Sequence, residues 1–258
     1  MAKKDWNPEL YMKYGKERTQ PSIDLVSRIE KQNPERIIDI GCGPGNSTRV
    51  LYQQWPGAQI TGADSSPAMI EAAGKYLPKL DWLLMDAGKD EFEEKFDIIF
   101  SNATIQWIPD HARLLRKFHN ALKEEGVIAI QVPLFWDMPI GIAIAETAKD
   151  KRWAGHTEGA TDLFIIHDYS WYYDHLTELY SSVEIWETYY MHVMDSQQAI
   201  MEMIRSTGLK PYFERLNNAE EQKIFEEIVF KSVVKDYPVQ KDGKVLFPFK
   251  RLFFIAEK

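Results

Sequence analysis

The sequence predicts an α/β protein with a doubly wound, Rossmann-like sheet of seven mostly parallel strands and a helical lid insertion. Strand-like apolar runs alternate with helix-like patterns over residues 34–133, which is typical of parallel sheets covered by helices. The first of these strands also runs directly into a glycine-rich turn. We expect the 258 residues to form a single domain with four parts: an N-terminal helical cap (1–33), a ligand-binding core (34–133), a lid (134–182), and C-terminal helices with edge strands (183–258).

The core can be followed element by element. In the cap, Asn7-Pro8 and Gln20-Pro21 each place a capping residue before a proline, which predicts helices near 8–17 and 21–32. Apolar runs predict strands at 36–40, 59–64, 82–86, 96–101 and 126–132. Helices are expected from 46 to 56, after Ser65-Ser66-Pro67, and after Asp110.

The regular alternation of strands and helices ends after the fifth predicted strand. Residues 134–182 are rich in tryptophan and tyrosine and only weakly periodic, which indicates a lid on the substrate side. Strand patterns return at 183–193 and 251–256 and flank helices near 195–206 and 218–236. We expect these two late strands to pair as an antiparallel edge.

Composition excludes several classes of protein. With 31 Lys+Arg against 39 Asp+Glu, the net charge of −8 argues against nucleic-acid binding. No apolar run approaches the roughly 18 residues of a membrane span, so no membrane association is expected. A single cysteine, Cys42, and the lack of a signal-peptide pattern predict a cytoplasmic protein. The six histidines show no metal-ligand spacing, so we predict no metal.

The glycine-rich turn, Asp39-Ile40-Gly41-Cys42-Gly43-Pro44-Gly45, carries the most information. Its glycines allow a positive φ and let a ligand approach bare backbone. A nicotinamide-dinucleotide fingerprint would require a small residue at Asn46, and a phosphate loop would require Gly-Lys-Ser/Thr, which is absent. Asp39, two residues before the first glycine, instead suits a cationic ligand such as an amino group or a sulfonium.

Further polar residues follow the next strands. Asp64 ends the second strand about 19 residues after Gly45, where a carboxylate can accept hydrogen bonds from ribose hydroxyls. Asp86 ends the third strand and Asn102 follows the fourth. Because the carboxyl ends of parallel strands converge, we expect these side chains to face one ligand together with Asp39 and Gly41.

The motif D-x-G-x-G-x-G at 39–45 and the acid at 64 resemble those of the class I S-adenosylmethionine-dependent methyltransferases, over about residues 34–133. The resemblance implies S-adenosylmethionine as cofactor, with S-adenosylhomocysteine as product. It implies that Gly41 and Gly43 approach the methionine part, that Asp64 holds the ribose, and that Asp86 with Ala87 reaches the adenine. The full predicted cofactor set is Asp39, Gly41, Gly43, Gly45, Asp64, Ser65, Asp86, Ala87, Asn102 and Ala103.

A narrower resemblance covers nearly the whole chain. The stretches at 5–8, 45–48, 64–70, 103–110, 172–173, 207–211 and 251–253 are similar to the branch of this family that methylates one carboxylate of trans-aconitate. The sequence departs from that branch at Gln20, where arginine is common, and around 150–170. The resemblance implies a small carboxylic acid as partner, and an ionised carboxylate nucleophile needs no general base, so no catalytic residue is predicted beyond positioning groups.

The acid would be held by cationic and phenolic groups. Tyr11, Tyr14 and Arg18 share one face of the first predicted helix at i, i+3 and i+7 spacing. Trp107 follows the fourth strand, and Arg251 stands in the Arg-Leu-Phe stretch near the C-terminus. These five residues form the predicted substrate site.

Several alternatives stay open at this point. A nicotinamide oxidoreductase shares the fold but needs a catalytic base such as Tyr-x-x-x-Lys, which is absent. A methyltransferase-fold protein that binds the cofactor without turnover, or one that methylates a fatty-acid carboxylate, a phenol or an amine, is also compatible with the sequence. We expect a monomer or a weak homodimer.

Overall fold

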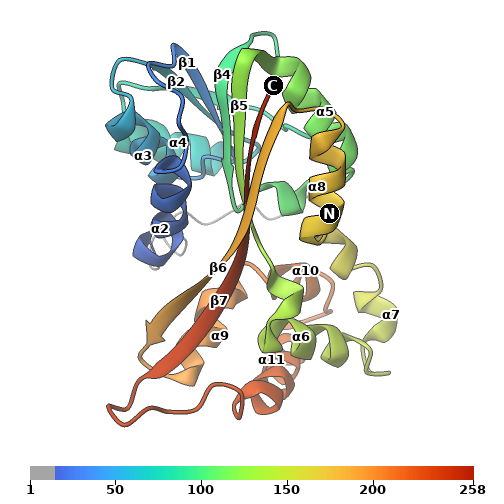
Figure 1. The fold of residues 1–258 in the computed structure, drawn as a ribbon. Coiled ribbons are helices and arrows are strands. Elements are labelled where there is room, and N and C mark those ends of the chain that lie inside the picture. The colour runs from blue at the N-terminus through green and yellow to red at the C-terminus, as the bar shows by residue number, and fades with distance from the viewer. Residues whose placement is uncertain (1–14) are drawn as a thin grey trace. The chain divides into compact units, whose positions relative to one another are not determined.

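The structure is a computed structural model that describes residues 15–258 (Figure 1). Its sheet has seven strands in the order β3-β2-β1-β4-β5-β7-β6. The pairs β1·β2, β1·β4, β2·β3 and β4·β5 are all parallel, which confirms the predicted fold class. The strands are β1 (Arg36–Ile40), β2 (Gln59–Asp64), β3 (Asp81–Leu84), β4 (Phe96–Asn102), β5 (Leu122–Pro133), β6 (Ser182–Met194) and β7 (Val245–Glu257).

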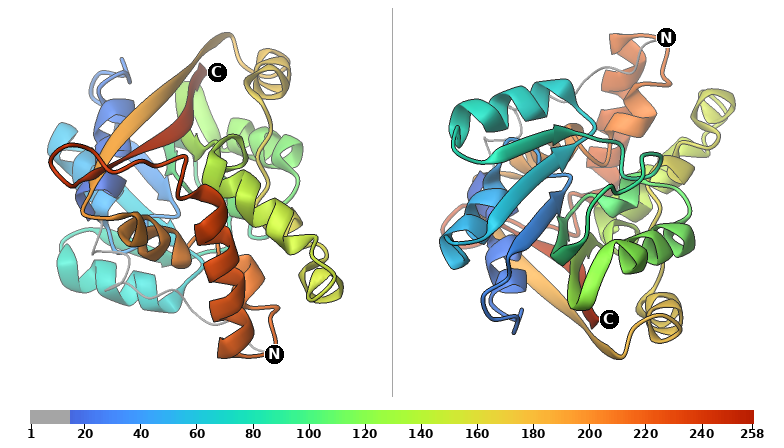
Figure 2. Two further views of the ribbon diagram at one scale, coloured as in Figure 1. Left: turned by 90° about the horizontal axis from the view of Figure 1, so that it is seen from below. Right: turned by 90° about the horizontal axis from the view of Figure 1, so that it is seen from above.

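The central strands are buried on both faces because helices cover the sheet on both sides. Every residue of β4 is buried, including Ile98, Ile99 and Phe100. In Figures 1 and 2, α2 (Gly15–Val26), α3 (Asn46–Gln54) and α4 (Pro67–Tyr76) lie on one side and α5 (His111–Ala121) on the other. α8 (Tyr169–Thr177) packs against α5. This arrangement leaves the carboxyl ends of the strands to carry the site.

The chain divides into two compact units. The first runs to Val132 and also contains 167–186 and 252–258, whereas the second contains 133–166 and 187–251. α8 therefore belongs to the first unit although it lies within the predicted lid range of 134–182, whose boundaries stay a prediction.

The second unit is mostly helical. Its α11 (Ala219–Val233) packs on α6 (Pro139–Ala148) and α9 (Gln197–Arg205). Phe135 is buried in this unit, so close to Gly208 that a Cβ there would meet the ring at 2.2 Å. The remaining short helices of this unit are η2 (Phe135–Asp137), α7 (Ala154–Thr157), η3 (Thr161–Leu163) and α10 (Lys210–Phe213).

The predicted helix break at Gln20-Pro21 is wrong, because α2 runs through Pro21 without interruption. Proline removes one backbone donor from the helix, and this loss is offset by the face that α2 buries. Ser22, Leu25 and Val26 are all buried on that face. The start of the first predicted helix, near residue 8, lies outside the described residues.

The described part of the chain contains neither a membrane-spanning helix nor a metal-binding group of side chains. Within residues 15–258 no helix combines the length and the apolar character needed to cross a membrane. In the same range, no three histidine, cysteine or acidic side chains are grouped so that they could hold a metal ion.

Candidate cofactor site

The glycine-rich turn between β1 and α3 has the backbone that its sequence demands. Gly41, Gly43 and Gly45 have φ values of 72°, 54° and 95°, a region that favours glycine. A Cβ on Gly41 would lie 2.0 Å from Thr104 Oγ1, so no other residue fits there. A Cβ on Gly43 would meet no atom of the described chain within 4 Å. The turn therefore presents bare backbone at Gly43.

Asp39 lies beneath this turn and is fully buried. Its Oδ2 accepts hydrogen bonds from Ser47 Oγ at 2.6 Å and Thr48 Oγ1 at 2.7 Å, at the start of α3. Its Oδ1 is buried and accepts no hydrogen bond from residues 15–258. Burial raises the pKa of Asp39 to about 6. The carboxyl group is thus poised to ionise when a cation comes close.

Asp64, at the end of β2, is tied to the glycine turn. Its Oδ2 accepts from the backbone N–H of Gly43 at 3.0 Å, and its Oδ1 accepts from that of Ser66 at 2.8 Å. The side chain is half-buried, and its neighbour Ser65 is exposed. Since each carboxylate oxygen has two lone pairs, Asp64 can accept further hydrogen bonds from a ligand.

The turn after β3 is held by its own acids. Asp86 Oδ1 accepts from Gly88 N at 3.0 Å, and Asp86 Oδ2 pairs with Lys89 Nζ at 2.6 Å. Asp90 Oδ2 accepts from Asp86 N at 2.8 Å. Ala87, between them, is buried. The two residues predicted to meet the adenine therefore lie on an ordered turn.

The end of β4 contributes Asn102 and Ala103. Asn102 is buried, and its Oδ1 accepts no hydrogen bond within the described range. Ala103 has a φ of 54°, an unfavourable value for a non-glycine residue that is often found at functional sites. Its N–H donates to Gln131 O at 2.9 Å on β5. The following turn, η1 (Ile105–Trp107), carries the half-buried Trp107.

α2 joins the glycine turn to the end of β4. Asn46 Nδ2 donates to Thr19 Oγ1 at 3.2 Å, and Asn102 Nδ2 donates to the carbonyl oxygen of Arg18 at 3.5 Å. Arg18 itself is buried. The structure thus brings the backbone of Arg18 beside Asn102, and the role of its guanidinium in substrate binding stays a prediction.

The other predicted substrate residues are placed differently. Tyr11 and Tyr14 lie outside the described residues. Arg251 belongs to the second unit, where it is buried and its guanidinium lies 4.4 Å from the ring centre of Phe249. This cation–π contact gives Arg251 a role in packing of that unit, and its role in substrate binding stays a prediction.

Three further residues hold this region together. Asn46, at the start of α3, bonds to α2. Thr104 fills the space above Gly41 and accounts for the glycine there. Gln106 is buried and donates from Nε2 to Ala103 O at 2.7 Å, which supports the unfavourable backbone of Ala103. The contacts of Asn46 and Thr104 have no local sequence signal, because each joins distant segments, whereas the contact of Gln106 lies within one turn.

Known proteins resemble this chain at the level of both sequence and fold. A family model described as a methyltransferase domain matches residues 14–212. The trans-aconitate 2-methyltransferase of Enterobacter sp. (strain 638) is 41% identical over 255 residues, and that of Shigella dysenteriae serotype 1 (strain Sd197) is 39% identical over 254; each match covers 98% of both chains. The crystal structure of the YcgJ protein from Bacillus subtilis shares the fold with a TM-score of 0.62 at 16% identity, over 92% of this chain and 98% of that one. The chain therefore belongs to the S-adenosylmethionine-dependent methyltransferase family, in the group that contains the trans-aconitate 2-methyltransferases.

Proposed function

We propose that this enzyme transfers the sulfonium methyl group of S-adenosylmethionine to a carboxylate oxygen of trans-aconitate, which yields a methyl ester and S-adenosylhomocysteine. The acceptor follows from the relatives named trans-aconitate 2-methyltransferase, which match over nearly the full length of the chain.

One observation about the site carries the proposal. Asp39 Oδ1, Asn46 Oδ1 and Asn102 Oδ1 are buried acceptors without a donor among residues 15–258. All three lie around the glycine turn, because Asp39 precedes it, Asn46 follows it, and Asn102, like Asn46, is bonded to α2. Buried acceptors without donors are costly. A cationic methionine moiety with an ammonium group would supply the missing donors.

The assignments along the cofactor follow the strand ends. We assign Gly41, Gly43 and Gly45 to the methionine part, Asp64 with Ser65 to the ribose, and Asp86 with Ala87 to the adenine. Asn102 and Ala103 would line the site beside the methyl group. Asp64 supports this reading because its bond to Gly43 N aligns a carboxylate with the bare backbone of the turn.

The chemistry requires little from the protein beyond alignment. When bound, S-adenosylmethionine supplies an electrophilic methyl group. A carboxylate with a reference pKa of about 4 is ionised at neutral pH, so no side chain has to remove a proton. The enzyme's contribution is to orient the acid and exclude water.

A trianionic acid also needs local positive charge in a chain whose net charge is −8. Arg18 is a buried arginine whose backbone carbonyl accepts from Asn102, and we propose that its guanidinium binds a carboxylate of the acid. Trp107, Tyr11, Tyr14 and Arg251 stay predictions as further contacts. The lid of residues 134–182, the cytoplasmic location and the monomeric or weakly dimeric state stay predictions as well.

The test is methyl transfer from labelled S-adenosylmethionine to trans-aconitate, with citrate, isocitrate and a fatty acid as competing acceptors. The expected product is a base-labile label on trans-aconitate alone, absent with Asp64→Ala. Methyl transfer to the fatty acid, or to a phenol or amine, would show that the acceptor is that compound and not trans-aconitate. Cofactor binding without transfer to any acceptor would point to a binding protein.

A further inference from the structure

Two buried polar side chains of α5 lie outside every site assigned above, and each is bonded to one of the turns at the site. Lys117 reaches the turn after β3, and His111 reaches the turn after β4. Both are buried, although lysine and histidine are rarely buried without partners. Their partners therefore indicate what these residues do.

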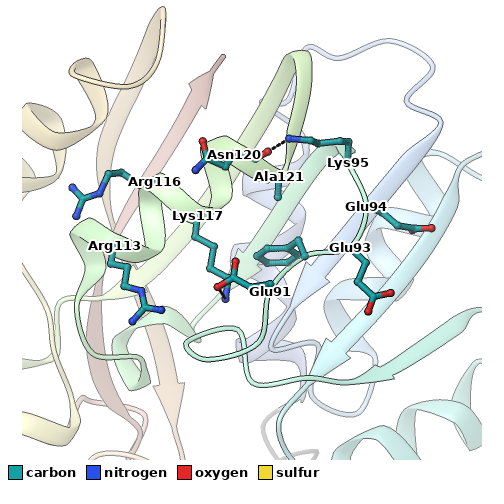
Figure 3. A pocket seen from close by; sticks show the side chains of 10 residues that line it. Glu91, Glu93, Glu94, Lys95, Arg113, Arg116, Lys117, Asn120 and Ala121 are labelled. Carbon is teal, nitrogen blue, oxygen red and sulfur yellow. Dashed lines mark hydrogen bonds and ion pairs between the residues drawn. The ribbon is translucent and has the colours of Figure 1, made fainter.

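Lys117 holds the turn that carries Asp86 and Ala87. Its Nζ donates to the carbonyl oxygens of Ala87, at 3.2 Å, and of Asp90, and lies 3.7 Å from a carboxylate oxygen of Glu91. Figure 3 shows Lys117 extending from its helix toward Glu91. An ammonium group has three protons, and here three acceptors of one short segment surround it. The amine therefore fixes the backbone of this turn to α5.

His111 holds the turn that carries Trp107. Its Nε2 lies 2.8 Å from the carbonyl oxygen of Ile105 and its Nδ1 lies 2.8 Å from Tyr172 Oη. A carbonyl only accepts, so Nε2 carries the proton, and Nδ1 of the neutral ring accepts from the tyrosine hydroxyl. Burial lowers the pKa of His111 to about 4, which keeps the ring neutral. Tyr172 lies on α8, so the bond chain joins three segments of the first unit.

We propose that α5 is a positioning helix, in which Lys117 sets the turn that receives the adenine and His111 sets the turn that faces the methyl acceptor. The inference rests on the proposed function for the identity of the two turns. Both residues act on backbone carbonyls and not on the reacting atoms, so they are positioning residues and not catalytic ones. Because they bind different turns, each should affect a different step.

For Lys117, the test compares Lys117→Met with Lys95→Met. Lys95 is a matched control, since its Nζ donates to the carbonyl oxygen of Asn120 in the same pocket and does not touch the turn after β3. Lys117→Met should raise the Kd of S-adenosylhomocysteine in calorimetry about tenfold, since a charge-assisted hydrogen bond is lost. Lys95→Met should leave that Kd unchanged.

For His111, the test compares His111→Leu with His119→Leu on the same helix. His119 packs edge-on against Tyr180 and makes no bond to the turn after β4 that the structure records. His111→Leu should lower kcat about tenfold at an unchanged Kd for S-adenosylhomocysteine. His111→Gln, which keeps an amide donor able to reach Ile105 O, should recover most of that loss.

Hydrogen exchange separates positioning from general destabilisation and does not depend on any acceptor. Lys117→Met should speed hydrogen exchange at the backbone amides of Lys89 and Asp90, which donate to Asp86 O. His111→Leu should speed hydrogen exchange at the backbone amides of Trp107 and Ile108. Equal acceleration across the whole core, or an unchanged Kd for Lys117→Met, would overturn the proposal. If the wild-type enzyme binds S-adenosylhomocysteine but methylates no acid, the proposed function fails, whereas the Kd and exchange comparisons still decide this inference.

Discussion

Thr104 packs directly over Gly41: the position of a Cβ on the glycine would lie 2.0 Å from Thr104 Oγ1. The same hydroxyl donates to the carbonyl oxygen of Gly41 at 3.3 Å. The turn after β4 thus rests on the turn after β1, so one contact sets the relative position of two turns that we assign to the cofactor site.

This contact predicts a large effect of Gly41→Ala. The substitution adds a methyl group where Thr104 stands and places alanine at a φ of 72°. We expect the free energy of unfolding to fall by more than about 2 kcal/mol, from overpacking and backbone strain together. Urea denaturation measures this, and Gly57→Ala, where the new Cβ meets nothing within 4 Å, is the control. Equal effects of the two variants would contradict the packing described here.

Asp64→Asn should separate cofactor binding from folding. The amide keeps the size of the side chain but cannot accept equally well from Gly43 N, Ser66 N and a ribose. We expect the Kd of S-adenosylhomocysteine to rise at least about tenfold. Asp81→Asn, at an exposed position of β3, should leave that Kd unchanged, and circular dichroism should show both variants folded. An unchanged Kd for Asp64→Asn would show that the Asp64 carboxylate does not bind the cofactor.

The pKa of Asp39 predicts a pH dependence with a definite sign. The folded protein raises this pKa from 3.8 to about 6, so it holds a proton that the unfolded chain releases between these values. The resulting stabilisation is fully present below pH about 4 and is lost as the pH rises through about 6. In the ligand-free protein, the wild type should therefore lose stability relative to Asp39→Asn over this interval.

Binding of a cation favours the ionised carboxylate of Asp39. S-adenosylmethionine should therefore bind roughly tenfold more tightly at pH 7 than at pH 5, with release of a proton near pH 6. Calorimetry in two buffers of different ionisation enthalpy measures that proton. Asp39→Asn should show neither the proton release nor the pH dependence, and the same pH dependence in this variant would assign it to another group.

Arg18→Met should impair the acid substrate and spare the cofactor. The bond that α2 makes to Asn102 uses the carbonyl oxygen of Arg18, so the substitution leaves that bond in place. We expect the KM for trans-aconitate to rise about 100-fold, since a charge-assisted pairing with a carboxylate is lost. Arg28→Met, which removes an exposed partner of Glu184, is the matched control. An unchanged KM would place the acid elsewhere.

The sequence predicts the sheet and the strand-end residues because both depend on local patterns. The run from Asp39 to Gly45 codes for a strand followed by a turn of positive φ, and the structure has both. Asp64 is the last residue of β2, and Asp86 follows β3. The positions of such residues at strand ends can be predicted from the residues next to them in the sequence.

Contacts between distant segments could not be predicted in this way. Helix α2 continues through Pro21 because it buries one face against the core. The residues next to the proline in the sequence do not show that this face is buried. Asn46 and His111 act through bonds to α2, α8 and the turn after β4. The burial of Lys117 could be predicted from the sequence, since its helical spacing places it on the apolar face of α5 with Leu114, Phe118 and Ala121.

Methyl transfer to trans-aconitate is tested by the mass of the acid after incubation with the enzyme and S-adenosylmethionine. We expect trans-aconitate to gain the mass of one methyl group, mild base to remove it, and Asp64→Ala to form none of this ester. An unchanged mass of trans-aconitate, in a sample whose calorimetry shows the cofactor bound, would contradict methyl transfer to this acid.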